Sequence, residues 1–152
     1  MRLSEYGISS GREIVINTPM SFIGLELVKR IKEHDSAVPV PGTAKYSADQ
    51  GILSSIAGYD YLAPYVNRMK NCRSDPCLEI REMRSFIDYR GLKTRILAAS
   101  LEEPSQVTDA LVAGAHTCTV PLAILKAMMY MRLHFLRSRF STVMVKSWDK
   151  HI

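Results

Sequence analysis

The sequence predicts an α/β fold in which about five parallel β-α units are followed by a long C-terminal helix. From residue 13 onward, short apolar runs alternate with amphipathic stretches that begin at helix-capping residues, which is the pattern of repeated β-α units. Several of the apolar runs are continuous rather than alternating. Continuous runs are typical of parallel strands that are covered on both faces.

The predicted strands span 13–17 (EIVIN), 38–43 (VPVPGT), 60–65 (DYLAPY), 94–99 (TRILAA) and 116–120 (HTCTV). Each run is short, and most contain β-branched or aromatic residues. Because a helix is predicted between successive runs, we expect the strands to pair in parallel.

Helix starts are marked by capping residues. Ser21 is placed to cap the helix after the first strand, and Ser47 with Gln50 forms a capping box before the next helix. Pro76 and Pro104 suit the first turns of two further helices.

Glycine positions and the spacing of apolar residues predict the helix ends and the apolar faces. Left-handed C-terminal caps are expected at Gly58 and Gly114. The predicted apolar stripes are Leu25, Val28 and Ile31; Ile52, Leu53 and Ile56; Ile80, Met83, Phe86 and Ile87; and Val107, Ala110 and Leu111.

A long last helix is predicted from about Leu122. Its apolar stripe is typical of a core or a subunit interface. The same region, residues 126 to 150, has six basic residues against one acidic residue, which accounts for the whole net charge of +5. The stripe runs through Leu125, Met128, Met129, Leu133, Leu136, Phe140 and Met144.

Composition favours one globular domain, 1–152, because 47% of the residues are apolar and 23% are charged. No run approaches the roughly 18 apolar residues of a membrane span, and the N-terminus lacks a signal-peptide stretch, so we expect a cytoplasmic protein without a membrane partner. The aromatic residues do not interleave with the basic ones, so nucleic-acid binding is not expected.

The cysteines and histidines give little sign of a metal or cofactor. Three cysteines are an odd number in a chain without secretion signals, so a disulfide framework is not expected. The pair Cys72 and Cys77 has no matching second pair, and the histidines lack metal-ligand spacing. His116 is expected to be a core or strand-end histidine, and no cofactor is predicted.

Three segments resemble, in order and spacing, the strand-to-helix stretches of the small transaldolases and fructose-6-phosphate aldolases. They are GTAKYSADQGILSSIAG (42–58), YLAPYVNR (61–68) and ILAASLEEPSQVTDALVAGAHTCTVPLAIL (96–125). The resemblance extends over about 14–125. It implies a (β/α)₈ TIM barrel whose active site lies at the C-terminal ends of the strands. Only about a dozen residues stand where the first three strands would be, so a partial barrel is expected.

The resemblance also implies roles for individual residues. Thr43 matches a substrate-contacting threonine, and Tyr65 matches the tyrosine that transfers a proton together with a water. Arg68 and Ser100 match the pair that holds the substrate phosphate, and a guanidinium with a hydroxyl suits a dianion. Ala63 is expected to line the same active site, at the C-terminal ends of the strands. Without the resemblance, each of these residues has an ordinary structural explanation as a strand-end, turn or solvated side chain.

The family lysine that forms a Schiff base is replaced by Asn17. The family reads roughly V-K-[IV]-P-[AMV]-T, whereas this chain reads INTPMS. An amide nitrogen is delocalised into its carbonyl and cannot form an imine, so catalysis is expected to be impaired. Lys45 would share the strand parity of Thr43 and is the one candidate substitute, although a lysine just after a strand is usually solvated.

Two functions are therefore open. The chain either keeps a sugar-phosphate pocket with little or no carbon-carbon bond turnover, or serves as a non-catalytic interaction subunit that binds a related full-length barrel or another protein. A partial barrel has two sheet edges and an uncovered inner face, expected to be rich in Val, Leu and Ile. A homo-oligomer through the C-terminal helix and the open edges is expected.

Overall fold

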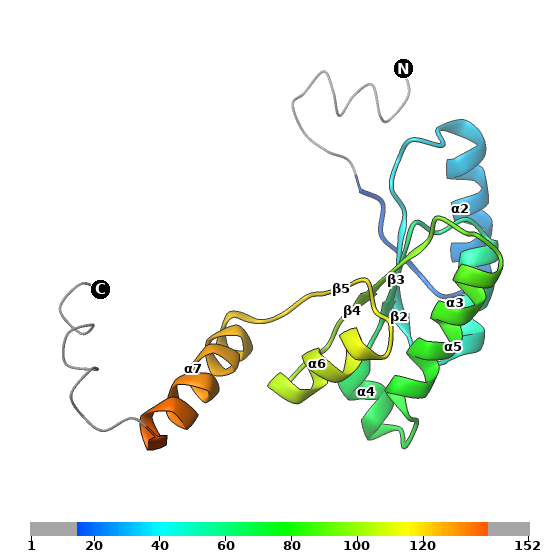
Figure 1. Cartoon of the computed structure of the whole chain (residues 1–152). Coiled ribbons are helices and arrows are strands. Elements are labelled where there is room, and N and C mark those ends of the chain that lie inside the picture. Colours follow the sequence, from blue (N-terminus) through cyan, green and yellow to red (C-terminus); the bar gives the residue numbers. More distant parts are fainter. Residues whose placement is uncertain (1–14, 140–152) are drawn as a thin grey trace, which may run out of the picture.

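The computed structural model of the chain describes residues 15–139, with side chains through residue 130. Within these residues, five strands form one sheet in which all neighbours pair in parallel (Figure 1). The arrangement confirms the predicted α/β class and is that of a partial (β/α)₈ barrel. In sheet order the strands are β1 (Thr18–Pro19), β2 (Pro41–Lys45), β3 (Tyr61–Pro64), β4 (Arg95–Ala98) and β5 (Thr117–Cys118).

Six helices accompany the strands in the described part of the chain. In Figure 1, α2, α3 and α5 lie along one side of the sheet, whereas α7 extends away from it. None of these helices is both long and apolar enough to cross a membrane. The helices are α2 (Phe22–His34), α3 (Ala48–Ile56), α4 (Val66–Asn71), α5 (Pro76–Tyr89), α6 (Pro104–Val112) and α7 (Leu122–Arg139).

The predicted N-terminal caps of the first two helices form, with one difference. The Ser21 hydroxyl accepts a hydrogen bond from the Gly24 N–H at 3.0 Å, and the Ser47 hydroxyl accepts one from the Gln50 N–H at 3.4 Å. The Gln50 side chain does not return to Ser47, as a capping box requires. It accepts instead from the N–H of Tyr46 at 2.8 Å.

The prolines and glycines at the other helix ends are where the sequence predicts them. Pro76 and Pro104 are in the first turns of α5 and α6. Gly58 and Gly114 adopt φ values of +94° and +113°, so they terminate α3 and α6 in a conformation that a side chain would oppose.

The regular ladder between β1 and β2 begins later than the predicted strands at 13–17 and 38–43. Pro39 and Pro41 have no N–H group, so they cannot donate to a ladder with the residues before β1. One backbone bond precedes the ladder, from the Ile16 N–H to the Pro39 carbonyl at 3.2 Å. The prediction of a strand at 13–17 is therefore wrong for its described part. The other three strands fall within their predicted ranges.

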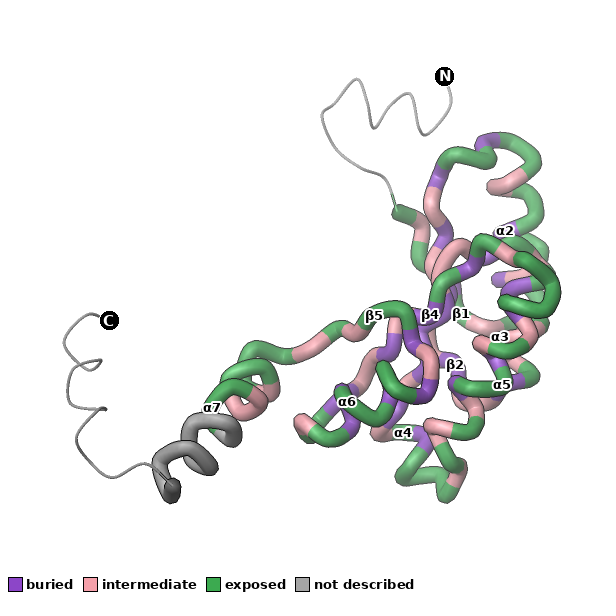
Figure 2. The backbone as a smooth tube through the Cα atoms, viewed as in Figure 1, coloured by how far each residue is buried: buried purple, intermediate pink, exposed green. Residues whose placement is uncertain are grey.

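The two faces of the sheet differ in burial. Leu62 and Ile96, which pair in register, are fully buried beneath the helices. Residues of the opposite parity, such as Thr43, Tyr61 and Arg95, are half-buried or exposed. In Figure 2 the buried stretches of the backbone gather where the strands meet the helices. The inner face thus carries polar side chains beside small ones, and the expectation of an inner face rich in Val, Leu and Ile is wrong.

The buried face of α3 is made of small residues rather than the predicted apolar stripe. Leu53 and Ile56 are 52% and 62% exposed. A Cβ at Gly51 would lie 2.5 Å from the Met83 sulfur of α5, so the two helices approach too closely for a larger side chain. The buried residues of α3 are Ala48, Gly51, Ser54 and Ser55.

The other predicted stripes are confirmed in large part. Val28 of α2 is buried, and so are Ile80, Met83 and Ile87 of α5. In α6, Val107 and Ala110 are buried. The remaining member of that stripe, Leu111, is 45% exposed, so its prediction is wrong.

The stripe of α7 is mostly uncovered where side chains are described. Leu125 and Met129 are 47% and 65% exposed, whereas Met128 packs against the core. A core role is therefore wrong for Leu125 and Met129 within this chain. The remaining predicted members lie outside the described side chains, and they are Leu133, Leu136, Phe140 and Met144.

Gly51→Ala is expected to lower the free energy of unfolding by about 1–3 kcal/mol, although alanine is the better helix former. The added methyl group would lie 2.5 Å from the sulfur and 2.7 Å from Cγ of Met83, which is fully buried and has little room to move. Urea denaturation of the wild type and the variant measures the difference.

Met83→Ala supplies the matched background. By itself it is expected to cost about 2–5 kcal/mol, because it leaves a cavity. It also frees the space above Gly51, so Gly51→Ala is then expected to raise stability by about 1 kcal/mol. An equal loss in both backgrounds would show that Met83 does not limit the approach of α3.

Candidate functional site

The carboxyl ends of parallel strands meet at one edge of the sheet, and three predicted site residues lie there. Thr43 is in β2 and pairs in register with Pro19 of β1. Tyr65 directly follows β3 and forms a bridge with Ala99. Ser100 is the next residue after Ala99. The topology therefore brings Thr43, Tyr65 and Ser100 to the same edge, where each is half-buried.

Asn17 and Ala63 lie on the same face as Thr43. Asn17 is exposed and stands two residues before Pro19, the register partner of Thr43. Alternate residues of an extended chain face the same side, so Asn17 faces the same side of the sheet as Pro19 and Thr43. Ala63 is 5% exposed and has the parity of Tyr65, two residues later. Asn17, which the sequence resemblance aligns with the Schiff-base lysine, thus has the parity of the inner face.

The Tyr65 ring lies between two other side chains. The ring of Tyr46 meets it edge-on, with 6.0 Å between centroids and 78° between planes. The guanidinium carbon of Arg68 lies 5.3 Å from the Tyr65 centroid, within the range of a cation–π contact. Arg68 is otherwise exposed. Sequence reasoning missed Tyr46, although it directly follows β2 just as Tyr65 follows β3.

Two backbone hydrogen bonds tie the start of α4 to the loop after β4. The Val66 N–H donates to the Ala99 carbonyl and the Asn67 N–H donates to the Ser100 carbonyl, both at 3.0 Å. Ser100 has a φ of +57°, a left-handed conformation that is unfavourable for any residue with a Cβ. Because Arg68 directly follows Asn67, these bonds bring the elements that carry Arg68 and Ser100 together.

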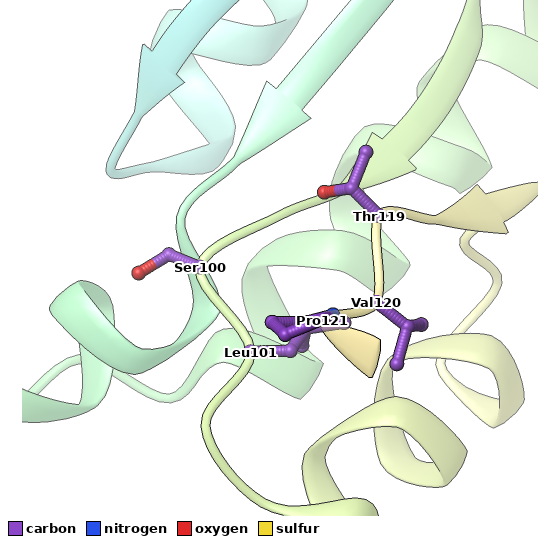
Figure 3. A pocket seen from close by; sticks show the side chains of 5 residues that line it. All are labelled: Ser100, Leu101, Thr119, Val120 and Pro121. Carbon is purple, nitrogen blue, oxygen red and sulfur yellow. The ribbon is translucent and has the colours of Figure 1, made fainter. Parts of the chain in front are cut away.

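A cavity of about 270 Å³ lies beside this loop, between the chain that follows β4 and the chain that follows β5 (Figure 3). In Figure 3 the apolar side chains gather on one side of the loop, and the Ser100 hydroxyl points away from them. The cavity therefore has an apolar wall on one side and hydroxyl groups at its rim. The lining residues are Ser100, Leu101, Thr119, Val120 and Pro121.

Lys45 does not lie on the face of Thr43, and the parity prediction is wrong. Gly42 pairs with Leu62 but Lys45 pairs with Pro64, so three steps along β2 match two steps along β3. This bulge, with Ala44 at a φ of +55°, rotates Lys45 to the helix-covered face. The lysine is fully buried rather than solvated.

The Lys45 amine has weak partners in that position. Nζ is 3.4 Å from the Thr43 carbonyl oxygen and 4.8 Å from the centroid of the Tyr59 ring. None of the ion pairs among the described side chains involves Lys45. Burial therefore lowers the pKa of Lys45 from its ordinary 10.5 to about 8.

In the part of the chain that the structure describes, no group of three or more His, Cys, Asp or Glu residues is arranged to hold a metal ion. His116 accepts a hydrogen bond at Nδ1 from the Ile96 N–H at 2.9 Å, so it satisfies the amino end of β4. Its prediction as a strand-end histidine is confirmed.

One comparison with known proteins bears on this site. A family model described as Transaldolase/Fructose-6-phosphate aldolase matches residues 3–150 of the chain. The match extends beyond both ends of the 14–125 segment in which the sequence motifs carry the resemblance.

Stability is expected to rise with pH between about 8 and 10.5, because Lys45 loses its proton near 8 when folded and near 10.5 when unfolded. Within that window the unfolded chain binds more protons. The full gain is about 3 kcal/mol at 1.36 kcal/mol per pKa unit. Urea denaturation across pH 7 to 11 measures it.

Lys45→Met is the matched variant. It removes the buried charge while keeping an unbranched chain, so it is expected to be about 2–3 kcal/mol more stable than the wild type at pH 7. The difference between the two proteins should vanish above pH 10.5. Lys32→Met is the control and is expected to lose stability, because Lys32 donates to Asp60 at 2.6 Å. If the stabilities of the wild type and Lys45→Met changed with pH in parallel, the Lys45 charge would not be the cause of the predicted rise.

Proposed function

Because the chain belongs to the transaldolase and fructose-6-phosphate aldolase family, we propose that it binds a sugar phosphate at the carboxyl edge of its sheet. We further propose that it has little or no carbon-carbon bond turnover. The pocket would be formed by Thr43, Ala63, Tyr65, Arg68 and Ser100.

The attachment of α4 to the loop after β4 is the observation that carries the binding proposal. It places the element with Arg68 beside Ser100 through the two backbone bonds at 3.0 Å. A guanidinium fork and a hydroxyl together match the oxygens of a phosphate dianion. Tyr65 and Thr43 stand at the neighbouring strand ends, where they would contact the sugar hydroxyls.

The proposed loss of turnover rests on the chemistry of the nitrogen groups near the carboxyl edge of the sheet. Family chemistry needs a free amine, because a protonated imine withdraws electrons from the breaking carbon-carbon bond. Asn17 supplies only an amide. Lys45 supplies an amine, but it is buried on the opposite face of the sheet, beneath Tyr59.

The binding proposal predicts a measurable affinity for fructose 6-phosphate by isothermal titration calorimetry. Arg68→Ala and Ser100→Ala are each expected to weaken binding by about tenfold or more, since a hydrogen bond to a charged group is worth about 1.5–3 kcal/mol. Lys70→Ala is the matched control, because it removes one positive charge from the same helix. Equal losses for Arg68→Ala and Lys70→Ala would indicate only non-specific charge attraction.

The turnover proposal predicts that borohydride traps no adduct. The protein would be incubated with dihydroxyacetone or fructose 6-phosphate, reduced, and weighed by mass spectrometry, and no gain in mass is expected. Lys45→Met is the control, because an adduct that vanishes in this variant must be on Lys45. A stoichiometric adduct on any lysine would overturn the proposed loss of chemistry.

A second candidate function is a non-catalytic interaction subunit that forms a homo-oligomer or binds a related barrel. The supporting observation is the exposed apolar surface of α7, where Leu122, Leu125, Met129 and Tyr130 are 65%, 47%, 65% and 66% exposed. Side chains of this size are costly to leave in water. Contact through the open sheet edges would add backbone hydrogen bonds.

Sedimentation velocity separates the two candidates. The interaction reading predicts an oligomer that Met129→Glu shifts toward the monomer, because a charge would be buried in the contact. Lys29→Glu on exposed α2 is the control and should leave the assembly unchanged. A monomer that binds fructose 6-phosphate would exclude the interaction subunit. An assembly that does not bind fructose 6-phosphate would exclude the sugar-phosphate pocket.

A further inference from the structure

We infer that Gln106 is a positioning residue for phosphate binding, because its side chain fixes the loop that carries Ser100 against the helix that carries Arg68. The inference rests on the proposed function and extends it to a residue that does not itself reach the ligand.

Gln106 is in the first turn of α6 and only 5% exposed. Its Oε1 accepts hydrogen bonds from the N–H groups of Glu102 at 2.7 Å and Glu103 at 3.3 Å. Its Nε2 donates to Oδ1 of Asn67 at 3.0 Å. One buried amide therefore holds the loop after β4 with its oxygen and α4 with its nitrogen.

Asn67 closes the connection. Its backbone N–H donates to the Ser100 carbonyl at 3.0 Å, and the next residue is Arg68. The hydrogen bonds thus run from Ser100 to Asn67, from Asn67 to Gln106, and from Gln106 back to the loop at Glu102. Only a side chain with a donor and an acceptor on one terminal group can serve both sides of this circuit.

Capping of α6 alone does not account for this arrangement. A capping glutamine needs only its oxygen on the backbone at the start of its own helix, whereas the Nε2 bond of Gln106 reaches another helix. The one ion pair between the same elements, Lys70 with Glu103 at 3.8 Å, joins side chains that are 60% and 58% exposed. Solvent screens such a pair, so it cannot set the geometry.

The site needs positioning for two reasons. Ser100 is in a left-handed conformation, with φ of +57°, that its surroundings must maintain. Arg68 is exposed, and its described ring contact is the Tyr65 ring, whose centroid lies 5.3 Å from the guanidinium carbon. Without the Gln106 amide, the loop and α4 would be free to separate, and the two groups would no longer bind one phosphate together.

Gln106→Met tests the inference, because methionine keeps the length of the side chain and removes both hydrogen-bonding atoms. We expect affinity for fructose 6-phosphate to fall about tenfold by calorimetry. Thr94→Val is the matched control, since it also removes a buried side-chain hydrogen bond, from the Thr94 hydroxyl to the Tyr59 carbonyl at 2.8 Å, at the amino end of β4 and not at the edge that carries Ser100. It should leave the affinity unchanged.

A double-mutant cycle with Arg68→Ala distinguishes positioning from a general loss of structure. When Arg68 is absent there is no pair to position, so Gln106→Met should cause no further loss of affinity. An equal loss with and without Arg68 would overturn the inference. Should Gln106→Met fail to fold, Asn67→Ala removes the same side-chain bond from the other partner while keeping the backbone bond to Ser100, and the same cycle applies.

The outcomes separate this inference from the proposed function. A wild-type protein that does not bind fructose 6-phosphate overturns both. A wild-type protein that binds it, with unchanged affinity in Gln106→Met and Asn67→Ala, overturns the positioning role alone.

Discussion

The candidate site depends on how the start of α4 is attached to the loop after β4. The N–H groups of Val66 and Asn67 donate to the carbonyls of Ala99 and Ser100. Both donors are in the first turn of a helix, where no intrahelical acceptor is available, so the attachment takes no hydrogen bond from α4 itself. Arg68 follows in the same turn. The direction of the helix start therefore decides where its guanidinium stands relative to the strand ends.

The two nitrogen groups that decide the chemistry lie on opposite faces of the sheet, because the strand register shifts by one residue. Asn17 has the parity of the inner face, but its nitrogen is an amide. Lys45 has an amine that burial makes easier to deprotonate, yet the bulge at Ala44 places it under the helices. Because side chains alternate along a strand, a single inserted residue moves a side chain from one face to the other. The proposed loss of turnover follows from that displacement as much as from the replacement at residue 17.

Local signals in the sequence predicted more of this structure than long-range ones. The helix ends at Ser21, Pro76 and Gly58 were predictable, because a cap is formed by residues a few positions apart. The bulge at Ala44 was not, because it exists only in the pairing of β2 with β3. The buried face of α3 was not predictable either, since it is set by the approach of α5 at Gly51. The site residues came from motif resemblance, which cannot identify a contact such as Gln106 with Asn67.

The distribution of apolar surface bears on how the chain would associate. The strands bury their apolar residues against the helices, and the inner face presents Thr43, Tyr61 and Arg95. The large exposed apolar side chains lie instead on helices, with Phe22 of α2 at 92% and Met129 of α7 at 65% exposed. Association driven by burial of apolar area would therefore engage helix surfaces, and the polar inner face would keep its access to small polar ligands. The proposed ligand binding and self-association would thus use different surfaces of the chain and need not compete.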